Sequence, residues 1–205
     1  MTLEEAIAKI KPLDHNAMEI AQKRWDSIAK PLHSLGKLET LLIQIAGITG
    51  NAEVDLSRRG LIVMCADNGV VKEGVTQTGQ EVTAIVAENF LKYDTSVGVM
   101  CKQNHAEIFP VDMGMVTDTK VRTDHKIAYG TQNMTKGPAM TREQAVKGLE
   151  AGIDMVRELN DKGYRILATG EMGIGNTTTS SAVASVLLKQ PVEEMTGRGA
   201  GLTSE

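Results

Sequence analysis

The sequence predicts an α/β protein: an open parallel, Rossmann-like sheet with flanking helices, preceded by a small N-terminal helical subdomain. Residues 60–188 alternate between short apolar runs of strand length and longer stretches of helix length, an order typical of a parallel sheet. The first apolar run has no polar face, and residues 1–50 show helical periodicity without a strand pattern. We expect a helical subdomain over 1–50 and an incomplete α/β domain over 51–205.

Two helical stretches are predicted in the N-terminal part. Apolar residues recur there every three or four positions, at Ala6, Ile10, Leu13, Ala17 and Ile20. Pro12 and Pro31 interrupt this pattern and should end or kink a helix. The next helix begins near Lys37, and Gly47 and Gly50 are expected to close it.

The first strand is expected at Leu61–Ala66, where every residue is apolar. Such a run indicates a central strand of a parallel sheet, buried on both faces. Helices are expected at about 82–90 and 95–104. The next strand would cover 106–111, and Pro110 argues against it or places it at a sheet edge, because proline has no N–H to donate.

The C-terminal third is predicted to hold one more strand between two helices. Residues 116–140 are polar and irregular. Thr141 is expected to cap a helix whose apolar stripe would be Ala145, Leu149, Ile153 and Val156. A strand over 166–169, a tight loop over Gly170–Asn176 and a helix over 177–188 should follow.

Composition argues against several classes of protein. The 205 residues include 22 Lys and Arg against 26 Asp and Glu, whereas a non-specific nucleic-acid binder needs a basic surface. No apolar run reaches the ~20 residues of a membrane span, and the acidic start lacks a signal-peptide core. Cys65 and Cys101 lack the spacing of a metal or redox pair. We therefore expect buried thiols in a cytoplasmic protein that binds neither nucleic acid nor membranes.

Three loops rich in glycine and polar residues follow the predicted strands. They are Asp67–Gly69, Asp112–Gly114 and Gly170–Asn176. Ligands of open parallel sheets bind outside the C-terminal ends of the strands. Each loop taken alone is more typical of a turn, but three at corresponding places favour a binding site.

The third loop has the features of an anion site. It joins a strand to a helix through Gly173, Ile174, Gly175, Asn176, Thr177 and Thr178. Glycines allow the backbone close to a ligand, and the N–H groups and dipole of a helix N-terminus favour phosphate. The loop matches neither the Walker pattern, which needs Lys at Asn176, nor the dinucleotide fingerprint, which needs Gly at Thr178. A capped helix after a glycine turn is an equally open interpretation.

Three carboxylates lie around this predicted anion site. Asp67 and Asp112, each taken singly, are more typical of caps. A phosphate would repel Glu171, so we expect Glu171 to face a hydroxyl or a developing positive charge. Together they would suit a sugar phosphate whose anomeric carbon becomes positive during the reaction. None of the four histidines has a partner at ligand spacing, so we predict no metal.

Ten short blocks of the sequence match one known family, and they follow one another in the same order. The blocks are Lys30-Pro31, Ser34–Glu39, Ala66–Val70, Glu73–Val75, Gln80–Thr83, Asn89-Phe90, Gly130–Met134, Gly137–Ala145, Gly170–Thr178 and Thr196–Gly201. So many ordered blocks are specific to a family, whereas one glycine loop is not. On these blocks the chain resembles the nicotinate-nucleotide–dimethylbenzimidazole phosphoribosyltransferase (CobT) family.

The resemblance implies transfer of phosphoribose from nicotinate mononucleotide to 5,6-dimethylbenzimidazole. The products would be α-ribazole 5′-phosphate, for the nucleotide loop of cobalamin, and nicotinate. It implies that Gly173–Thr178 bind the phosphoribose, that Glu171 supports catalysis beside them and that Gln80 lines the benzimidazole pocket. We place Asp67 with the substrate-binding residues as well. A homodimer and no cofactor are expected.

The sequence departs from the family pattern in two respects. Asn68 stands where many relatives carry His, and Thr76–Gly79 replaces a segment with Ser and Pro, so the preferred base is open. Family members also continue past the Gly-Arg-Gly block, and the general base that the family uses is a glutamate in that continuation. General-base help is typically worth ~10²–10⁴ in rate, so we expect a fragment with impaired activity. The alternatives are a non-catalytic relative that binds a base or nucleotide and, less favoured, a dinucleotide oxidoreductase.

Overall fold

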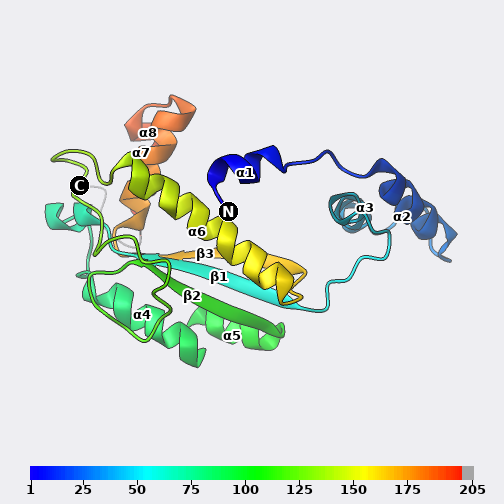
Figure 1. Ribbon diagram of the computed structural model, residues 1–205, viewed down its shortest axis with the longest axis horizontal. Coiled ribbons are helices and arrows are strands. Elements are labelled where there is room, and N and C mark those ends of the chain that lie inside the picture. The colour runs from blue at the N-terminus through cyan, green and yellow to red at the C-terminus, as the bar shows by residue number, and fades with distance from the viewer. Residues whose placement is uncertain (200–205) are drawn as a thin grey trace. The chain divides into compact units, whose positions relative to one another are not determined.

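The chain divides into two compact units, with the boundary between Arg58 and Arg59. Thr2–Arg58 forms the smaller unit, and the residues from Arg59 onward form the larger one together with Met1. The computed structural model describes residues 1–199, and Figure 1 labels the helices and strands.

Three helices make up the smaller unit: α1 (Leu3–Ala8), α2 (His15–Ser27) and α3 (Lys37–Thr49). Pro12 lies in the connection between α1 and α2, as predicted. Gly50 closes α3 in the left-handed conformation, with φ of 65°. The prediction that Gly47 also closes this helix was wrong. Gly47 lies buried inside α3, where α2 packs so closely that a Cβ would lie 2.7 Å from the Met18 side chain.

A buried ion pair holds the connection between α2 and α3. Lys30 Nζ lies 2.8 Å from Glu39 Oε1, and the two side chains are 13% and 4% exposed. The hydrogen bond from Lys30 holds the pKa of Glu39 below its usual value. Elsewhere in this unit, a cavity of about 590 Å³ is lined by Trp25, Leu42 and neighbouring residues.

The larger unit contains an open parallel sheet of three strands, which confirms the predicted fold class. The strands β1 (Arg59–Ala66), β2 (Ala106–Gly114) and β3 (Ile166–Met172) lie in the order β2-β1-β3. The apolar strand β1 is central, with Leu61 opposite Ile108 of β2 and Ala168 of β3. Within the described sheet, the proline-containing strand β2 lies at an edge.

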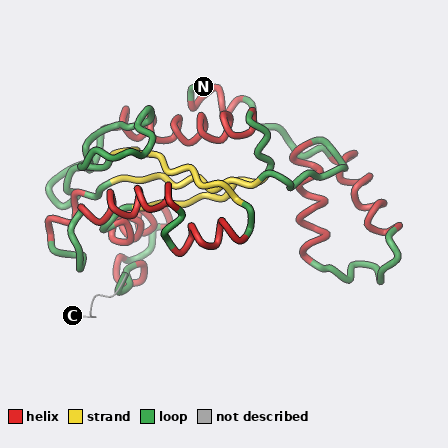
Figure 2. Tube along the Cα trace, turned by 90° about the horizontal axis from the view of Figure 1, so that it is seen from below, coloured by secondary structure: helices red, strands yellow, loops and turns green. Residues whose placement is uncertain are grey.

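Helices cover both faces of the sheet, with α4 (Glu81–Lys92) and α5 (Ser96–Gln103) on one face and α6 (Arg142–Asp161) on the other (Figures 1 and 2). Side chains of β1 alternate between the two faces. Val63 and Cys65 pack in the cluster that contains Phe90 of α4, while Ile62 packs with Met155 of α6. Cys65 and Cys101 are both buried free thiols.

The face of α6 that is buried differs from the predicted stripe. Ala151, Met155 and Leu159 are buried, whereas Leu149 and Val156 are 56% and 47% exposed. Both lines of residues are apolar, so periodicity could not decide which one faces the sheet. The helix start was predicted correctly.

After β3 the described chain forms two more helices, α7 (Asn176–Leu188) and the short α8 (Val192–Met195). The predicted loop began too early, because Gly170–Met172 belong to β3. These residues continue the parallel pairing with β1, where Gly170 lies opposite Val63 and Met172 opposite Cys65. Helix α8 was missed because four residues are too few to show a period.

Candidate functional site

The loops after β1, β2 and β3 meet at one edge of the sheet. The N–H of Asp67 donates to the carbonyl of Gly114 at 2.9 Å. On the other side, the Asn68 side chain donates to the carbonyl of Ile174 at 3.1 Å. The loop after β1 is therefore bonded to both neighbours. The second predicted loop was wrong, because Asp112–Gly114 form the end of β2, but this strand end lies in the same region as the loops after β1 and β3.

The loop between β3 and α7 needs its two glycines for different reasons. A Cβ at Gly173 would lie 2.2 Å from the carbonyl oxygen of Ala66, so no other residue fits without a backbone shift. Gly175 caps α7 with φ of 84° and offers no side-chain hydrogen bond to the helix. The first N–H groups of α7 thus have no cap from this residue, and their partial positive charge suits an anion.

Other residues surround this end of α7. Asn176 begins the helix, and the hydroxyl-bearing Thr177 and Thr178 follow within its first turn. Thr177 is exposed, and a Cβ at Gly199 would lie 3.0 Å from its Oγ1. Part of the Gly-Arg-Gly block therefore passes beside the first turn of α7. Ala200 and Gly201, which complete that block, lie outside the described residues.

Glu171 lies on β3 immediately before the glycine loop. Its Oε2 accepts a hydrogen bond from the side-chain amide of Asn176. The residue as a whole is exposed, but burial of its carboxyl group raises the pKa above the usual value, and the Asn176 bond opposes that shift. The carboxylate is thus held beside the N-terminus of α7, where it can face a positive centre but repels a second anion.

Asp67 and Asp112 are almost completely buried, at 1% and 0% exposed. Asp112 Oδ1 accepts the N–H of Met115 at 2.7 Å, and Lys126 Nζ lies 3.1 Å from Oδ2. The Asp112 carboxylate is therefore paired with the Lys126 ammonium and has a structural role. Asp67 Oδ2 accepts the N–H of Val116 at 2.7 Å, while Oδ1 has no hydrogen-bond partner among the described residues. Substrate contact by Asp67 stays a prediction.

Gln80 precedes α4 and bonds the turn after β1. Its Nε2 donates to the carbonyl of Asn68 at 3.1 Å. This contact places the Gln80 side chain next to the three-loop region. A role for Gln80 in binding the base stays a prediction.

A segment that the sequence reasoning did not assign to the site crosses the turn after β1. Thr131 Oγ1 accepts the N–H of Gly69 at 3.0 Å, and a Cβ at Gly69 would lie 2.5 Å from the carbonyl oxygen of Thr131. Glu73 accepts hydrogen bonds from Asn133 and Thr135, at 2.5 and 3.0 Å. Gly69, Thr131, Glu73 and Asn133 all lie in blocks that match the family. That match was the sequence signal that could have assigned this segment to the site.

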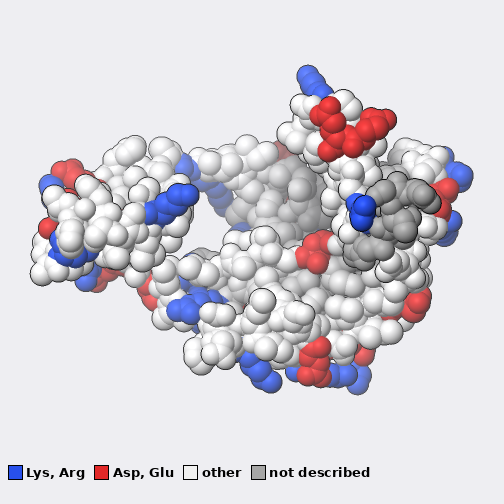
Figure 3. All heavy atoms as spheres, turned by 180° about the vertical axis from the view of Figure 1, so that it is seen from behind, with Lys and Arg blue, Asp and Glu red and all other residues white. Residues whose placement is uncertain are grey.

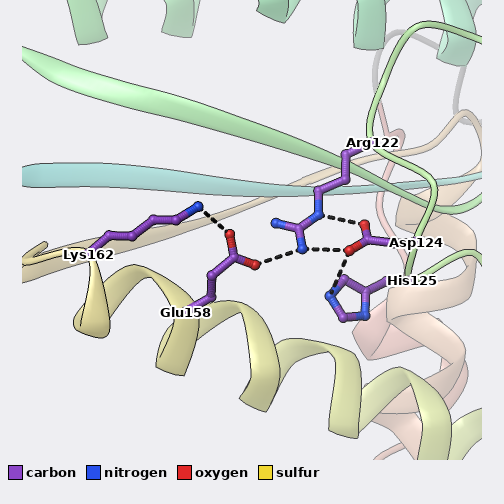
Figure 4. Close-up of polar contacts among 5 residues, drawn as sticks. All are labelled: Arg122, Asp124, His125, Glu158 and Lys162. Carbon is purple, nitrogen blue, oxygen red and sulfur yellow. Dashed lines mark hydrogen bonds and ion pairs between the residues drawn. The ribbon is translucent and has the colours of Figure 1, made fainter.

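The long loop after β2 is anchored to α6 by an ion-pair cluster (Figure 4). Arg122 bonds Asp124 within the loop and lies 2.7 Å from Glu158 Oε2. Lys162 bonds the other oxygen of Glu158 at 2.5 Å. Hydrogen bonds from Arg122 and Lys162 lower the pKa of Glu158 to about 2. The cluster ties the loop to α6, and Thr131, farther along the same loop, bonds the turn after β1.

Within residues 1–199, no three His, Cys, Asp or Glu side chains gather in an arrangement that could hold a metal ion. No helix in that range has the length and apolar character needed to cross a membrane. On the face shown in Figure 3, basic side chains of the described residues are scattered among acidic ones.

Solved structures share this architecture. CobT from Thermus thermophilus matches with a TM-score of 0.84 and 35% identity, over 92% of this chain and 58% of that one. A second structure from the same organism, named as the nicotinate-nucleotide–dimethylbenzimidazole phosphoribosyltransferase, matches with a TM-score of 0.82, over 91% of this chain and 58% of that one.

Curated relatives named nicotinate-nucleotide–dimethylbenzimidazole phosphoribosyltransferase are similar along this whole chain. The Ruminiclostridium cellulolyticum protein is 50% identical over 100% of this chain and 59% of its own length. The Clostridium tetani protein is 46% identical over 99% of this chain and 57% of its own length. The chain thus spans less than two thirds of these relatives. A family described as "Phosphoribosyltransferase" matches residues 10–205. The chain therefore belongs to the CobT family of phosphoribosyltransferases.

Proposed function

We propose that this chain binds the phosphoribose of nicotinate mononucleotide for transfer to 5,6-dimethylbenzimidazole. The names of the relatives supply this reaction. The observation in this chain that carries the proposal is the N-terminus of α7, where Gly175 leaves the helix without a side-chain cap. A 5′-phosphate would replace the missing cap by accepting backbone N–H groups.

The chemistry gives Glu171 a supporting role. In the proposed transfer, the bond from the anomeric carbon to nicotinate breaks as a bond to the benzimidazole nitrogen forms on the opposite face. Positive charge develops on the ribose, and the ionised carboxylate of Glu171 beside the phosphate site would stabilise it. We assign the role of general base for the incoming benzimidazole to none of the described residues.

The second candidate is binding of a nucleotide or base without transfer. A search for α-ribazole 5′-phosphate after incubation with both substrates separates the two candidates, because only the first produces it.

Calorimetric titration with nicotinate mononucleotide and with inorganic phosphate tests the binding step. Gly175→Asp should weaken both ligands at least tenfold, since it places a negative charge at the anion site. Gly175→Ala adds a side chain at a positive φ without adding charge, so it tests backbone strain alone and should weaken both ligands less. Gly36→Asp is the matched control, because Gly36 also caps a helix with positive φ, at 54°, in the smaller unit. The proposal is wrong if the unaltered chain binds neither ligand at millimolar concentration, or if Gly175→Asp binds normally.

A further inference from the structure

Asn68 joins the loop after β1 to the start of α7 through both ends of its side chain. Its Nδ2 donates to the carbonyl of Ile174 at 3.1 Å, and its Oδ1 accepts from Thr179 Oγ1 at 2.9 Å. The residue is 8% exposed. The two contacts lie on either side of Gly175, one just before the helix and one within its first turn.

The glycine loop has few means of fixing its own orientation. Gly173 and Gly175 carry no side chains, and Gly175 makes no side-chain cap. The peptide groups of Ile174 are instead held from outside the loop. The N–H of Ile174 donates to Oγ1 of the fully buried Thr83 of α4, at 3.1 Å, and its carbonyl accepts from Asn68.

An amide side chain suits this place for a chemical reason. Asparagine offers a donor and an acceptor on one rigid plane, and here the donor meets a carbonyl while the acceptor meets a hydroxyl. An aspartate would set an oxygen against the Ile174 carbonyl, and an alanine would leave both partners unmatched in a largely buried place.

We propose that Asn68 is the positioning residue of the anion site, setting where the first N–H groups of α7 point. Asn68 itself touches no ligand in this proposal and acts through Ile174 and Thr179. The inference rests on the proposed function, because it assigns to Asn68 the geometry of the phosphate-binding end of α7.

Two variants on opposite sides of the contact test it. Asn68→Ala removes both hydrogen bonds, and Thr179→Val removes one without a change of charge. Each should weaken inorganic phosphate and nicotinate mononucleotide by about fivefold to tenfold, the usual worth of a buried hydrogen bond. Thr179→Ser keeps the hydroxyl and should bind like the unaltered chain, which a general loss of packing would not allow.

Amide hydrogen exchange measures the positioning without any ligand. Asn68→Ala should speed exchange of the Ile174 N–H about tenfold, because Ile174 loses one of the two hydrogen bonds that hold its flanking peptide groups from outside the loop. Asn104→Ala is the matched control, since the side-chain amide of Asn104 donates to the carbonyl of Met100 at the end of α5. It should change neither exchange at Ile174 nor phosphate affinity.

The outcomes separate this inference from the proposed function. Unchanged exchange at Ile174 in Asn68→Ala overturns the inference, whatever the ligands do. Faster exchange with unchanged phosphate affinity also overturns it, because the loop geometry would then not govern the site. Faster exchange in a chain that binds neither ligand before substitution supports the positioning of α7 and overturns the proposed function instead.

Discussion

Lys126 Nζ lies 3.1 Å from Oδ2 of Asp112, a carboxylate that is fully buried at the C-terminal end of β2. The Lys126 side chain is itself only 11% exposed, and its ammonium also lies 3.2 Å from Asp118 and 3.8 Å from the centre of the Tyr129 ring. Burial lowers the pKa of Lys126, but hydrogen bonds to Asp112 and Asp118 outweigh it and raise the pKa overall. Lys126, which lies in the long loop after β2, thus supplies the positive charge that compensates the buried carboxylate of Asp112 in that strand.

Lys126→Met should destabilise the larger unit by about 3–5 kcal/mol, because Asp112 is left as an uncompensated buried charge. The double variant with Asp112→Asn should recover at least half of that loss. Urea unfolding measures both. Lys147→Met is the control, since Lys147 pairs with Glu143 at the exposed surface of α6 and should change the free energy of unfolding little. Equal losses in the two single variants would contradict a special role for the buried pair.

The Arg122–Glu158 contact predicts a dependence of stability on acid pH. The pKa of Glu158 lies at about 2 in the folded chain, against an ordinary value of 4.5, chiefly because of the hydrogen bond from Arg122. The unfolded chain therefore binds the proton more tightly, and this contribution to stability is lost as the pH falls from about 5 to 2.

Glu158→Gln should flatten that pH dependence, which chemical unfolding at a series of pH values measures. Glu143→Gln is the comparison on the same helix, because Glu143 pairs with a lysine alone. An identical slope in the unaltered chain and in Glu158→Gln would show that the contact in Figure 4 is not formed in solution.

Gly173→Ala and Gly152→Ala should have opposite effects on stability. A Cβ at Gly173 meets the carbonyl oxygen of Ala66 at 2.2 Å, so the strand end or the loop must shift. A Cβ at Gly152 on α6 meets no atom within 4 Å. We expect Gly173→Ala to cost about 2 kcal/mol or more, as overpacking does, and Gly152→Ala to gain up to about 1 kcal/mol of helix stability. Midpoints of thermal unfolding that shift in the same direction would count against the close approach at Gly173.

Asn176→Ala should raise the pKa of Glu171 further. Burial already raises this pKa, and the hydrogen bond from Asn176 is what opposes the shift. Carbon-13 NMR of the labelled side-chain carboxyl follows the titration. The pKa of Glu73, whose carboxylate is bonded by Asn133 and Thr135 instead, should not move. A fall in the pKa of Glu171 would mean that Asn176 favours the protonated acid, the reverse of our expectation.

Much of the candidate site could be predicted because its signals are local. The loop from Gly173 to Thr178 joins a strand to a helix, as its glycines and threonines indicated. Asp112 shows where this reasoning failed. The sequence predicted it after a strand, like Asp67, whereas it lies inside β2, and its ion pair with Lys126 depends on the path of an irregular loop. The bonds of the Asn68 side chain to Ile174 and Thr179 likewise join segments far apart in the sequence, which no local pattern indicates.

The sequence by itself determined the type and order of the larger elements. An entirely apolar run specified the central strand β1, and Thr141 as a capping residue specified the start of α6, because both signals act over a few neighbouring residues. Tertiary structure alone decided which apolar line of α6 is buried, how far β3 extends, and that Asn68 bonds residues more than 100 positions away. Those outcomes depend on packing and hydrogen bonds between distant segments, which no local pattern records.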